Sequence, residues 1–136
     1  MALQHFEWKD AYSVKVKIID EQHKNLFKII DELYQSILAG NQKENLPEIL
    51  KQLNDYANYH FSTEEKYFKK FNYKEADVHI AIHQTFKKRL AGMEAKASNK
   101  NFDGFELLVF LQNWWVNHIL DIDKKYSENF NQHGLK

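Results

Sequence analysis

Seven side chains of metal-binding type occur at positions that predicted helices would turn toward their apolar faces. They comprise five of the seven histidines, one glutamate and one aspartate. Burying an imidazole or a carboxylate is unfavourable unless a partner compensates for its lost hydration. A bound metal would compensate for all of them at once, so metal binding is the chemistry that this set indicates. The set is His23, His60, Glu64, His79, His83, His118 and Asp123.

The spacing of these residues predicts that they face one another. His60 and Glu64 are four residues apart, and so are His79 and His83, which puts each pair on one helix face. Counted from the connections expected near residues 41, 73 and 100, the side chains also lie at matching heights, to within about one helical turn. A lone histidine on an apolar stripe is more often a hydrogen-bonded core residue. Agreement in both face and height favours a shared metal site.

His118 and Asp123 depart from this spacing. Five residues on an ideal helix separate two side chains by about 140°. Either the two reach around opposite sides of a dinuclear centre, or the helix widens locally into a π-type turn, which occurs often at functional sites. Two other histidines, His5 and His133, match no partner and are interpreted as ordinary terminal residues, and Glu65 is expected to be solvated.

Four predicted helices carry the candidate ligands. Glycine and proline are scarce, at four and one, and apolar residues recur with helical spacing. Asp20 and Asp103 are expected N-caps, Gly40 ends the first helix, and Pro47 falls in the first turn of the second. The second helix is expected to end at a turn around residues 72–73, and the third near residue 98.

The predicted fold is therefore all-α, an up-down-up-down antiparallel four-helix bundle with an extended N-terminal arm. Residues 1–136 are expected to form a single domain, whose arm (1–18) lays its aromatic residues against the bundle (19–127) and which ends in a C-terminal tail (128–136).

Composition excludes several other classes of protein. Lysine plus arginine equals aspartate plus glutamate at 19 each, so charge does not favour binding to nucleic acid or to an anionic membrane. No apolar run approaches the ~20 residues of a membrane span, and the start, with Glu7 and Asp10, does not resemble a secretory signal. We therefore expect a cytoplasmic protein without membrane insertion.

The types and number of the candidate ligands limit which metal ions could bind. The sequence has no cysteine, so any ion must be held by nitrogen and oxygen. Seven ligands exceed the four of a tetrahedral zinc and suit two octahedral or near-octahedral ions that share bridging carboxylates. Imidazole with carboxylate suits iron among several first-row metals, and spacing alone does not separate iron from manganese or cobalt.

Four strings in this sequence resemble the bacteriohemerythrins, and Trp8 with Tyr12-Ser13-Val14 extends the resemblance over nearly the whole chain. The strings are Asp20-x-Gln22-His23-Lys24, His60-Phe61-x-x-Glu64-Glu65, His79-x-x-x-His83 and His118-Ile119-x-x-x-Asp123. The resemblance implies that His79, His83 and His118 hold one iron, that His23 and His60 hold the other, and that Glu64, Asp123 and an oxo or hydroxo oxygen bridge them. It also favours Asp123 over Asp121 as the aspartate ligand.

The same resemblance implies two iron ions that alternate between Fe2+ and Fe3+, with O2 as a reversible ligand of the second iron. The O2 pocket of the family corresponds here to Leu26, Phe61, Trp114, Trp115 and Ile119. Trp115 departs from the family, in which a smaller aliphatic residue, often leucine, is usual. Its indole either restricts the access of O2 or is ordinary core packing, and both interpretations stay open.

The expected function is oxygen binding for storage, transport and delivery, or scavenging, without catalysis. Oxygen-activating bundles of the ferritin-like kind use Glu-x-x-His pairs, and this sequence has none. The alternatives are an O2 or redox sensor module, which the lack of a second domain disfavours, and a di-iron enzyme acting on peroxide or nitric oxide, for which we identify no proton path. A metal-free interaction domain would not explain the histidines. We expect a monomer, with an O2-consuming enzyme as its candidate partner.

Overall fold

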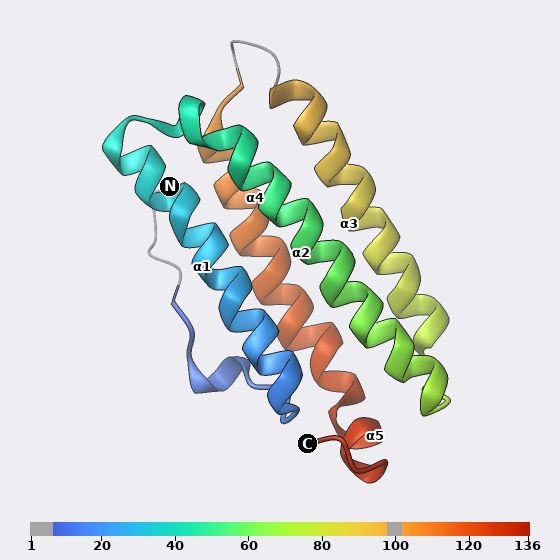
Figure 1. The fold of residues 1–136 in the computed structure, drawn as a ribbon. Coiled ribbons are helices and arrows are strands. Elements are labelled where there is room, and N and C mark those ends of the chain that lie inside the picture. The colour runs from blue at the N-terminus through green and yellow to red at the C-terminus, as the bar shows by residue number, and fades with distance from the viewer. Residues whose placement is uncertain (1–6, 98–101) are drawn as a thin grey trace.

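The computed structural model describes residues 7–97 and 102–136, and α-helices account for most of them. Four long helices run up and down in a bundle (Figure 1). They are α1 (Lys17–Ala39), α2 (Gln42–Lys70), α3 (Ala76–Ala97) and α4 (Gly104–Asn117). The described ranges contain no strand, so the predicted all-α four-helix bundle is confirmed.

Shorter elements extend the chain at both ends. A 3-10 turn (Asp10–Tyr12) precedes α1. After α4 the chain continues through a π-helical segment (His118–Ile122), a 3-10 turn (Asp123–Tyr126) and the short helix α5 (Ser127–Gln132). The segment assigned to the tail thus includes most of α5, and α5 buries Phe130 completely.

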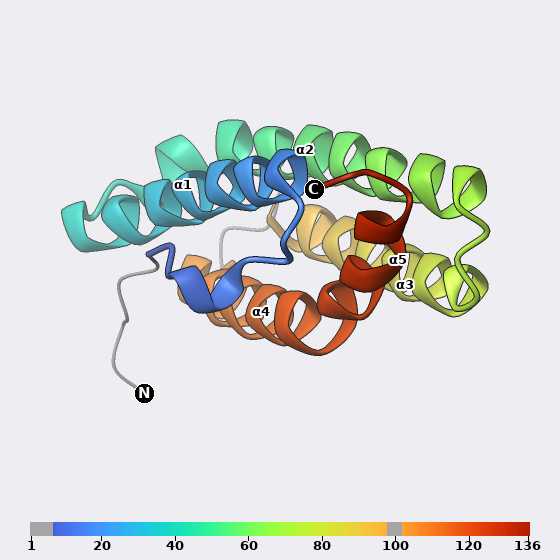
Figure 2. The same ribbon diagram turned by 90° about the horizontal axis from the view of Figure 1, so that it is seen from below.

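The core lies where the apolar faces of the long helices meet. α1 packs against α2 and α4, and α2 packs against α3 and also contacts α4 (Figure 2). Leu26, Phe61 and Leu111, from α1, α2 and α4, are all fully buried. Burial of such apolar stripes supplies most of the stability of a helix in a bundle.

Several predicted helix boundaries are confirmed. Gly40 adopts a left-handed conformation (φ 76°), and its N–H donates to the C=O of Ile37 at the end of α1. Asn72 also has a positive φ of 51°, as a tight turn between α2 and α3 requires. Asp103 caps α4, because its carboxylate accepts the N–H of Phe105 at 2.9 Å.

Two other boundary predictions are wrong. α1 begins at Lys17, directly after the N-cap residue Val16, so Asp20 lies within the first turn and does not cap the helix. Its carboxylate accepts the hydroxyl of Ser13 at 2.6 Å and the N–H of Val14 at 2.9 Å, which fastens the arm to the first turn. Pro47 lies in the second turn of α2 rather than in its first, so its missing N–H removes a hydrogen bond within the helix.

The arm lies against the bundle, as expected. The rings of Trp8 and Tyr12 lie 5.9 and 5.3 Å from that of Phe27 on α1. His5 and Phe6 lie outside the described residues. At the other end of the chain, the Ser127 hydroxyl donates to the C=O of Val14, which joins the arm to the start of α5.

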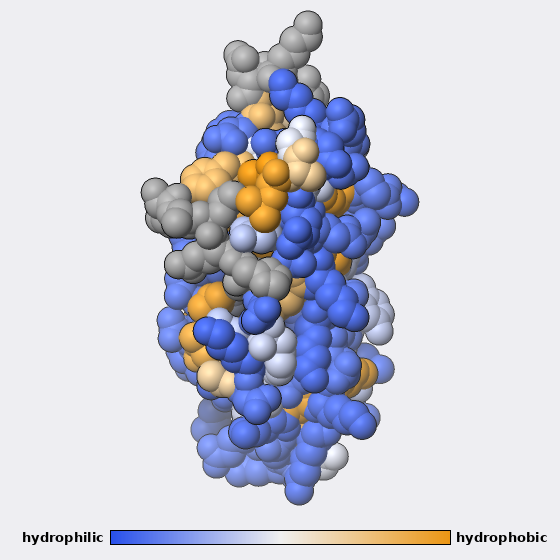
Figure 3. All heavy atoms as spheres, turned by 90° about the vertical axis from the view of Figure 1, so that its left-hand side faces the viewer, coloured by the Kyte–Doolittle hydropathy of each residue, from blue (hydrophilic) through white to orange (hydrophobic). Residues whose placement is uncertain are grey.

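The outer surface is largely polar. On the face shown in Figure 3, hydrophilic residues predominate and hydrophobic residues form small separate groups. Within residues 7–97 and 102–136, no helix combines the length and the apolar character that a membrane crossing requires.

Candidate metal centre

The seven predicted ligands come together between the helices. One atom from each of five residues, Glu64, His79, His83, His118 and Asp123, lies within 4.8 Å of the others. A second group obeys the same limit and contains His23, His60, Glu64 and Asp123. The two groups share their carboxylates, and every member is at most 3% exposed. The predicted convergence is therefore confirmed, whereas a role as metal ligands is proposed below.

Each side of the bundle contributes to this centre. His23 comes from the first half of α1, and His60 and Glu64 come from the second half of α2. His79 and His83 lie in the first half of α3. Because consecutive helices are antiparallel, these halves all lie at one end of the bundle.

A π-helical turn places the remaining two ligands. The segment His118–Ile122 is π-helical, and the N–H of Asp123 reaches back to the C=O of His118. This is the five-residue hydrogen bond of a π turn, which brings residues five apart onto one side of the chain. Of the two geometries left open by the sequence, the π turn is the one found. Asp121 is exposed, in contrast to the buried Asp123.

Asp123 lies between the two groups of histidines. Its Oδ1 is 3.0 Å from the Nε2 atoms of His79 and His118. Its Oδ2 is 3.1 Å from His23 Nε2. One oxygen therefore faces the three-histidine group, and the other faces the two-histidine group.

Glu64 also faces both groups, through a single oxygen. Its Oε1 lies 3.1 Å from His83 Nε2 and 3.5 Å from His60 Nε2. Across the two-histidine group, the Nε2 atoms of His23 and His60 are only 3.2 Å apart.

These short separations leave the polar atoms without satisfactory partners. None of six buried atoms makes a well-oriented hydrogen bond, although each lies close to the others. They are Glu64 Oε1, both carboxylate oxygens of Asp123, and the Nε2 atoms of His79, His83 and His118. Buried polar atoms in native proteins are normally satisfied. A cation among these lone pairs would satisfy them together, so the residues fit a metal centre.

Two of the imidazoles are oriented by hydrogen bonds at Nδ1, the ring nitrogen that does not face the centre. The partners are residues to which the sequence assigned no functional role. His60 Nδ1 lies 2.6 Å from the side-chain oxygen of Gln22, and His83 Nδ1 lies 2.9 Å from the carboxylate of Glu65. Both partners accept, so each Nδ1 carries the proton and each Nε2 keeps its lone pair directed into the centre. The expectation that Glu65 is simply solvated is therefore wrong.

Glu64 has a similar support. The Tyr126 hydroxyl donates to Glu64 Oε2 at 2.5 Å, on the oxygen that does not face the histidines. Gln22, Glu65 and Tyr126 all lie within three residues of a predicted ligand along the chain. Their closeness to a ligand along the chain was a signal that they could support the centre. The direction in which their side chains point, however, depends on how the helices pack.

Burial favours the neutral form of two of the imidazoles, those of His60 and His83. It lowers the pKa of His60, and the neighbouring imidazole of His23 lowers this pKa further. Burial, together with His79 and His118, lowers the pKa of His83 to about 2. Neutral imidazole is the form that binds a metal ion.

The pKa values of the two carboxyl groups, those of Glu64 and Asp123, shift in opposite directions. Burial raises the pKa of Glu64, and the charge of Asp123 raises it further. Burial also opposes ionisation of Asp123, but His118 and the other imidazoles outweigh it and hold the pKa of Asp123 well below its usual range. Without a cation the two negative charges disfavour each other, and a bound cation would favour ionisation of both.

Apolar and aromatic residues cover the centre. Leu26, Phe61, Trp115 and Ile119 are fully buried, whereas Trp114 is half-buried. This set was expected to form an O2 pocket.

Three of these aromatic rings contact the candidate ligands directly. Phe61 stacks on His83 with ring centroids 3.8 Å apart, and Trp114 stacks on His118 at 4.3 Å. Trp115 borders both halves of the centre, because its ring lies 5.8 Å from His60 and 5.9 Å from His118.

The remaining histidines take no part in the centre. His133 is exposed, stacks on Phe71 with ring centroids 4.6 Å apart, and lies 2.8 Å from the C=O of Asn129 through its Nδ1. His5 lies outside the described residues.

Known proteins are similar to this chain in sequence and in fold. The profile of the hemerythrin HHE cation binding domain matches residues 14–128. A bacteriohemerythrin from Clostridium acetobutylicum is 31% identical over 90% of this chain and 99% of its own length. A myohemerythrin from Theromyzon tessulatum is 33% identical over 90% of this chain and 91% of its own length.

Solved structures agree with these relatives. The crystal structure of a wild-type hemerythrin superposes with a TM-score of 0.83, at 29% identity, over 93% of this chain and 97% of that chain. The bundle, the paired His/Glu/Asp groups and the match over residues 14–128 lead to one conclusion. The chain belongs to the hemerythrin family and is of the bacteriohemerythrin type.

Proposed function

We propose that this protein binds dioxygen reversibly at a non-haem di-iron centre, for O2 storage, delivery or scavenging. The observation that carries the proposal is the pair of overlapping buried donor groups that share Glu64 and Asp123. In this proposal residues 1–136 act as a single hemerythrin-like domain, and His79, His83 and His118 hold one ion while His23 and His60 hold the other.

The two halves of the centre offer unequal numbers of protein donors. Five residues surround one position, and four surround the other. An ion that prefers near-octahedral coordination therefore has more room for an external ligand on the side of His23 and His60. This inequality supports binding of a small molecule there.

A pair of ferrous ions would supply two electrons to O2 on binding and recover them on release. The chain's own contribution is to hold the ligands and to exclude water. Gln22 and Glu65 orient two imidazoles, and Tyr126 orients Glu64. The complete burial of Leu26 and Ile119 keeps the centre dry, which protects a reversible carrier from competing hydrolysis and proton leakage.

The absence of catalysis is also part of the proposal. The titratable side chains next to the candidate ligands include Tyr126 and Glu65, which form hydrogen bonds to them, and Tyr56, whose ring stacks on that of His60. Carriage of O2 needs no further acid or base, whereas turnover of a substrate would need one.

Iron analysis and optical spectra test this proposal. We expect two irons per chain, and charge-transfer bands in the oxidised protein that disappear on reduction and return with O2. Fewer than two metals per chain would contradict the di-iron centre. Steady consumption of peroxide or nitric oxide with a reductant would favour an enzyme instead.

A matched pair of variants makes the test specific. His118→Ala removes a candidate ligand that is 3% exposed, and His133→Ala removes an exposed histidine outside the centre. Only the first should reduce the iron content and abolish the O2-dependent bands. Equal effects of the two variants would contradict the assignment.

A further inference from the structure

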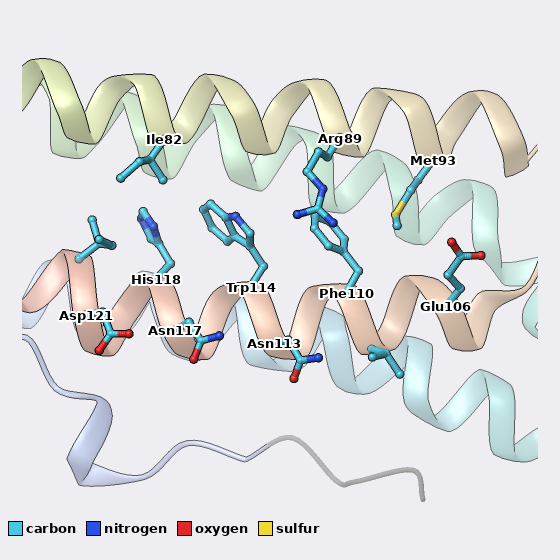
Figure 4. A pocket seen from close by; sticks show the side chains of 12 residues that line it. Ile82, Arg89, Met93, Glu106, Phe110, Asn113, Trp114, Asn117, His118 and Asp121 are labelled. Carbon is cyan, nitrogen blue, oxygen red and sulfur yellow. The ribbon is translucent and has the colours of Figure 1, made fainter. Parts of the chain in front are cut away.

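A groove between α3 and α4 reaches the candidate metal centre from the surface (Figure 4). Its volume is about 680 Å³, which lies within the range of small-molecule sites. Residues from both helices line it, and His118 is one of them. Trp114 was expected in the O2 pocket and His118 is a candidate ligand, but the proposed function assigns no role to the rest of this groove.

Aromatic side chains form the wall of the groove on α4. Phe110 and Trp114 on α4, and His118 directly after it, follow one another along the chain and point toward α3 (Figure 4). Trp114 is half-buried and stacks on His118, with ring centroids 4.3 Å apart and an angle of 14° between the rings. Trp114 thus connects the groove to a candidate ligand through direct ring contact.

One positive charge faces this wall. Arg89 is the only arginine in the sequence. Its guanidinium lies 4.3 Å from the ring centroid of Phe110, and it forms no ion pair with any residue in the described ranges 7–97 and 102–136. A guanidinium stacked on an aromatic ring keeps its N–H groups free to bind a phosphate or a carboxylate.

The other polar residues restrict what can bind. Asn113 and Asn117 contribute neutral amides to the lining but point away from α3, and Glu106 and Asp121 lie toward the two ends of the groove (Figure 4). Carboxylates at the ends disfavour an extended polyanion. The lining therefore suits a flat aromatic molecule with a single anionic group close to Arg89.

We propose that this groove binds a planar aromatic electron donor carrying an anionic group, a reduced flavin nucleotide being the class with that chemistry, and that electrons enter the centre through Trp114 and His118. This inference rests on the proposed di-iron function, because a centre oxidised to the ferric state must be reduced before it binds O2 again. The reduced flavin loses two electrons and two protons. Each of two ferric ions gains one electron, and the protons pass to water.

Calorimetric titration of the iron-loaded ferric protein with oxidised FMN tests the binding step. We expect saturable binding with one FMN per chain. Arg89→Gln should weaken it about tenfold, because a charge-assisted hydrogen bond to the phosphate is lost. Lys88→Gln is the matched control, since Lys88 is exposed on the same helix but does not line the groove, and it should leave the affinity unchanged. Riboflavin, which lacks the phosphate, should bind wild type and Arg89→Gln equally.

Anaerobic mixing with photoreduced FMN tests the electron step. The rate of reduction of the ferric centre should saturate with FMN concentration in wild type and in Lys88→Gln, and Arg89→Gln should need about tenfold more FMN. Absence of FMN binding, or equal behaviour of the two variants, would overturn the proposal.

The outcomes also separate this inference from the proposed function. If FMN binds through Arg89 but the reduced protein does not bind O2, the proposal for the groove is supported and the proposal of reversible O2 binding is contradicted. If O2 binds reversibly but FMN does not bind, the groove proposal alone fails.

Discussion

Replacing Tyr126 with phenylalanine would remove a single hydroxyl from behind the candidate centre. That hydroxyl donates to Glu64 Oε2 at 2.5 Å, and both residues are fully buried. The ring of Tyr126 packs against Phe68 and Phe130 with centroid separations of 5.7 and 4.3 Å. Phenylalanine would keep these contacts, so Tyr126→Phe isolates the hydrogen bond to the carboxylate.

The expected effect follows from the charge of Glu64 in the metal-bound protein. A hydrogen bond to a charged group contributes about 1.5–3 kcal/mol. Loss of a group that orients a metal ligand typically weakens metal binding about 10- to 100-fold, which agrees with that free energy. Because Glu64 belongs to both donor groups, the affinities for both ions should fall.

Competition between the reduced protein and a chromogenic chelator under anaerobic conditions would measure this change for ferrous iron. Tyr73→Phe is the matched control, since the Tyr73 hydroxyl donates to the exposed Glu75 at 3.3 Å and not to the centre. Far-UV circular dichroism would verify that both variants keep the helical fold. If Tyr126→Phe bound iron within twofold of wild type, the hydroxyl would not support the carboxylate as we argue.

Three further predictions address the aspartate ligand, the pocket and the response to acid. The Asp123→Asn variant should bind fewer than two metal ions per chain, whereas the Asp121→Asn variant, changed on the exposed side of the π segment, should bind two. Equal metal contents of the two variants by elemental analysis would contradict the role of the π turn. Trp115→Leu should change the O2 association or dissociation rate, because the indole borders both halves of the centre, and unchanged stopped-flow rates would assign this indole to core packing alone. In the metal-free protein, burial and neighbouring imidazoles lower the pKa of His83 to about 2. A histidine in the unfolded chain has a pKa of ~6.5. Below pH ~6.5 the unfolded chain therefore binds a proton that the folded protein does not bind at His83. The free energy of unfolding should therefore fall as the pH falls from about 6.5, with the raised pKa of Glu64 offsetting part of the loss; urea denaturation at several pH values would detect this, and greater stability in acid would refute it.

Helix positions and helix faces could be predicted because both are local properties of the chain. Gly40 and Asp103 mark helix ends through their own backbone and side-chain chemistry, and the structure has them where expected. The spacing of four between His79 and His83 determines that they share a face in any helix. Even the π turn was one of two predicted solutions, since a separation of five residues does not fit a regular helix.

Boundaries and directions that depend on distant residues could not be predicted in this way. Asp20 has the residue type of an N-cap, but its carboxylate bonds to Ser13 and Val14 because the arm folds back over the first turn. Glu65 has the sequence context of a surface residue, but α3 brings His83 to within 2.9 Å of its carboxylate.

Residue spacing predicted that seven donors from four helical segments would converge, because position around and along a regular helix follows from residue number, and only the step from His118 to Asp123 needed the π turn. Which groups orient those donors, and where the surface opens toward them, depends on how the helices pack against one another. The contact of Tyr126 with Glu64 joins residues 62 positions apart, and the groove beside His118 depends on how α3 and α4 lie relative to each other. Distances between helices set both features, and no spacing within one helix encodes them.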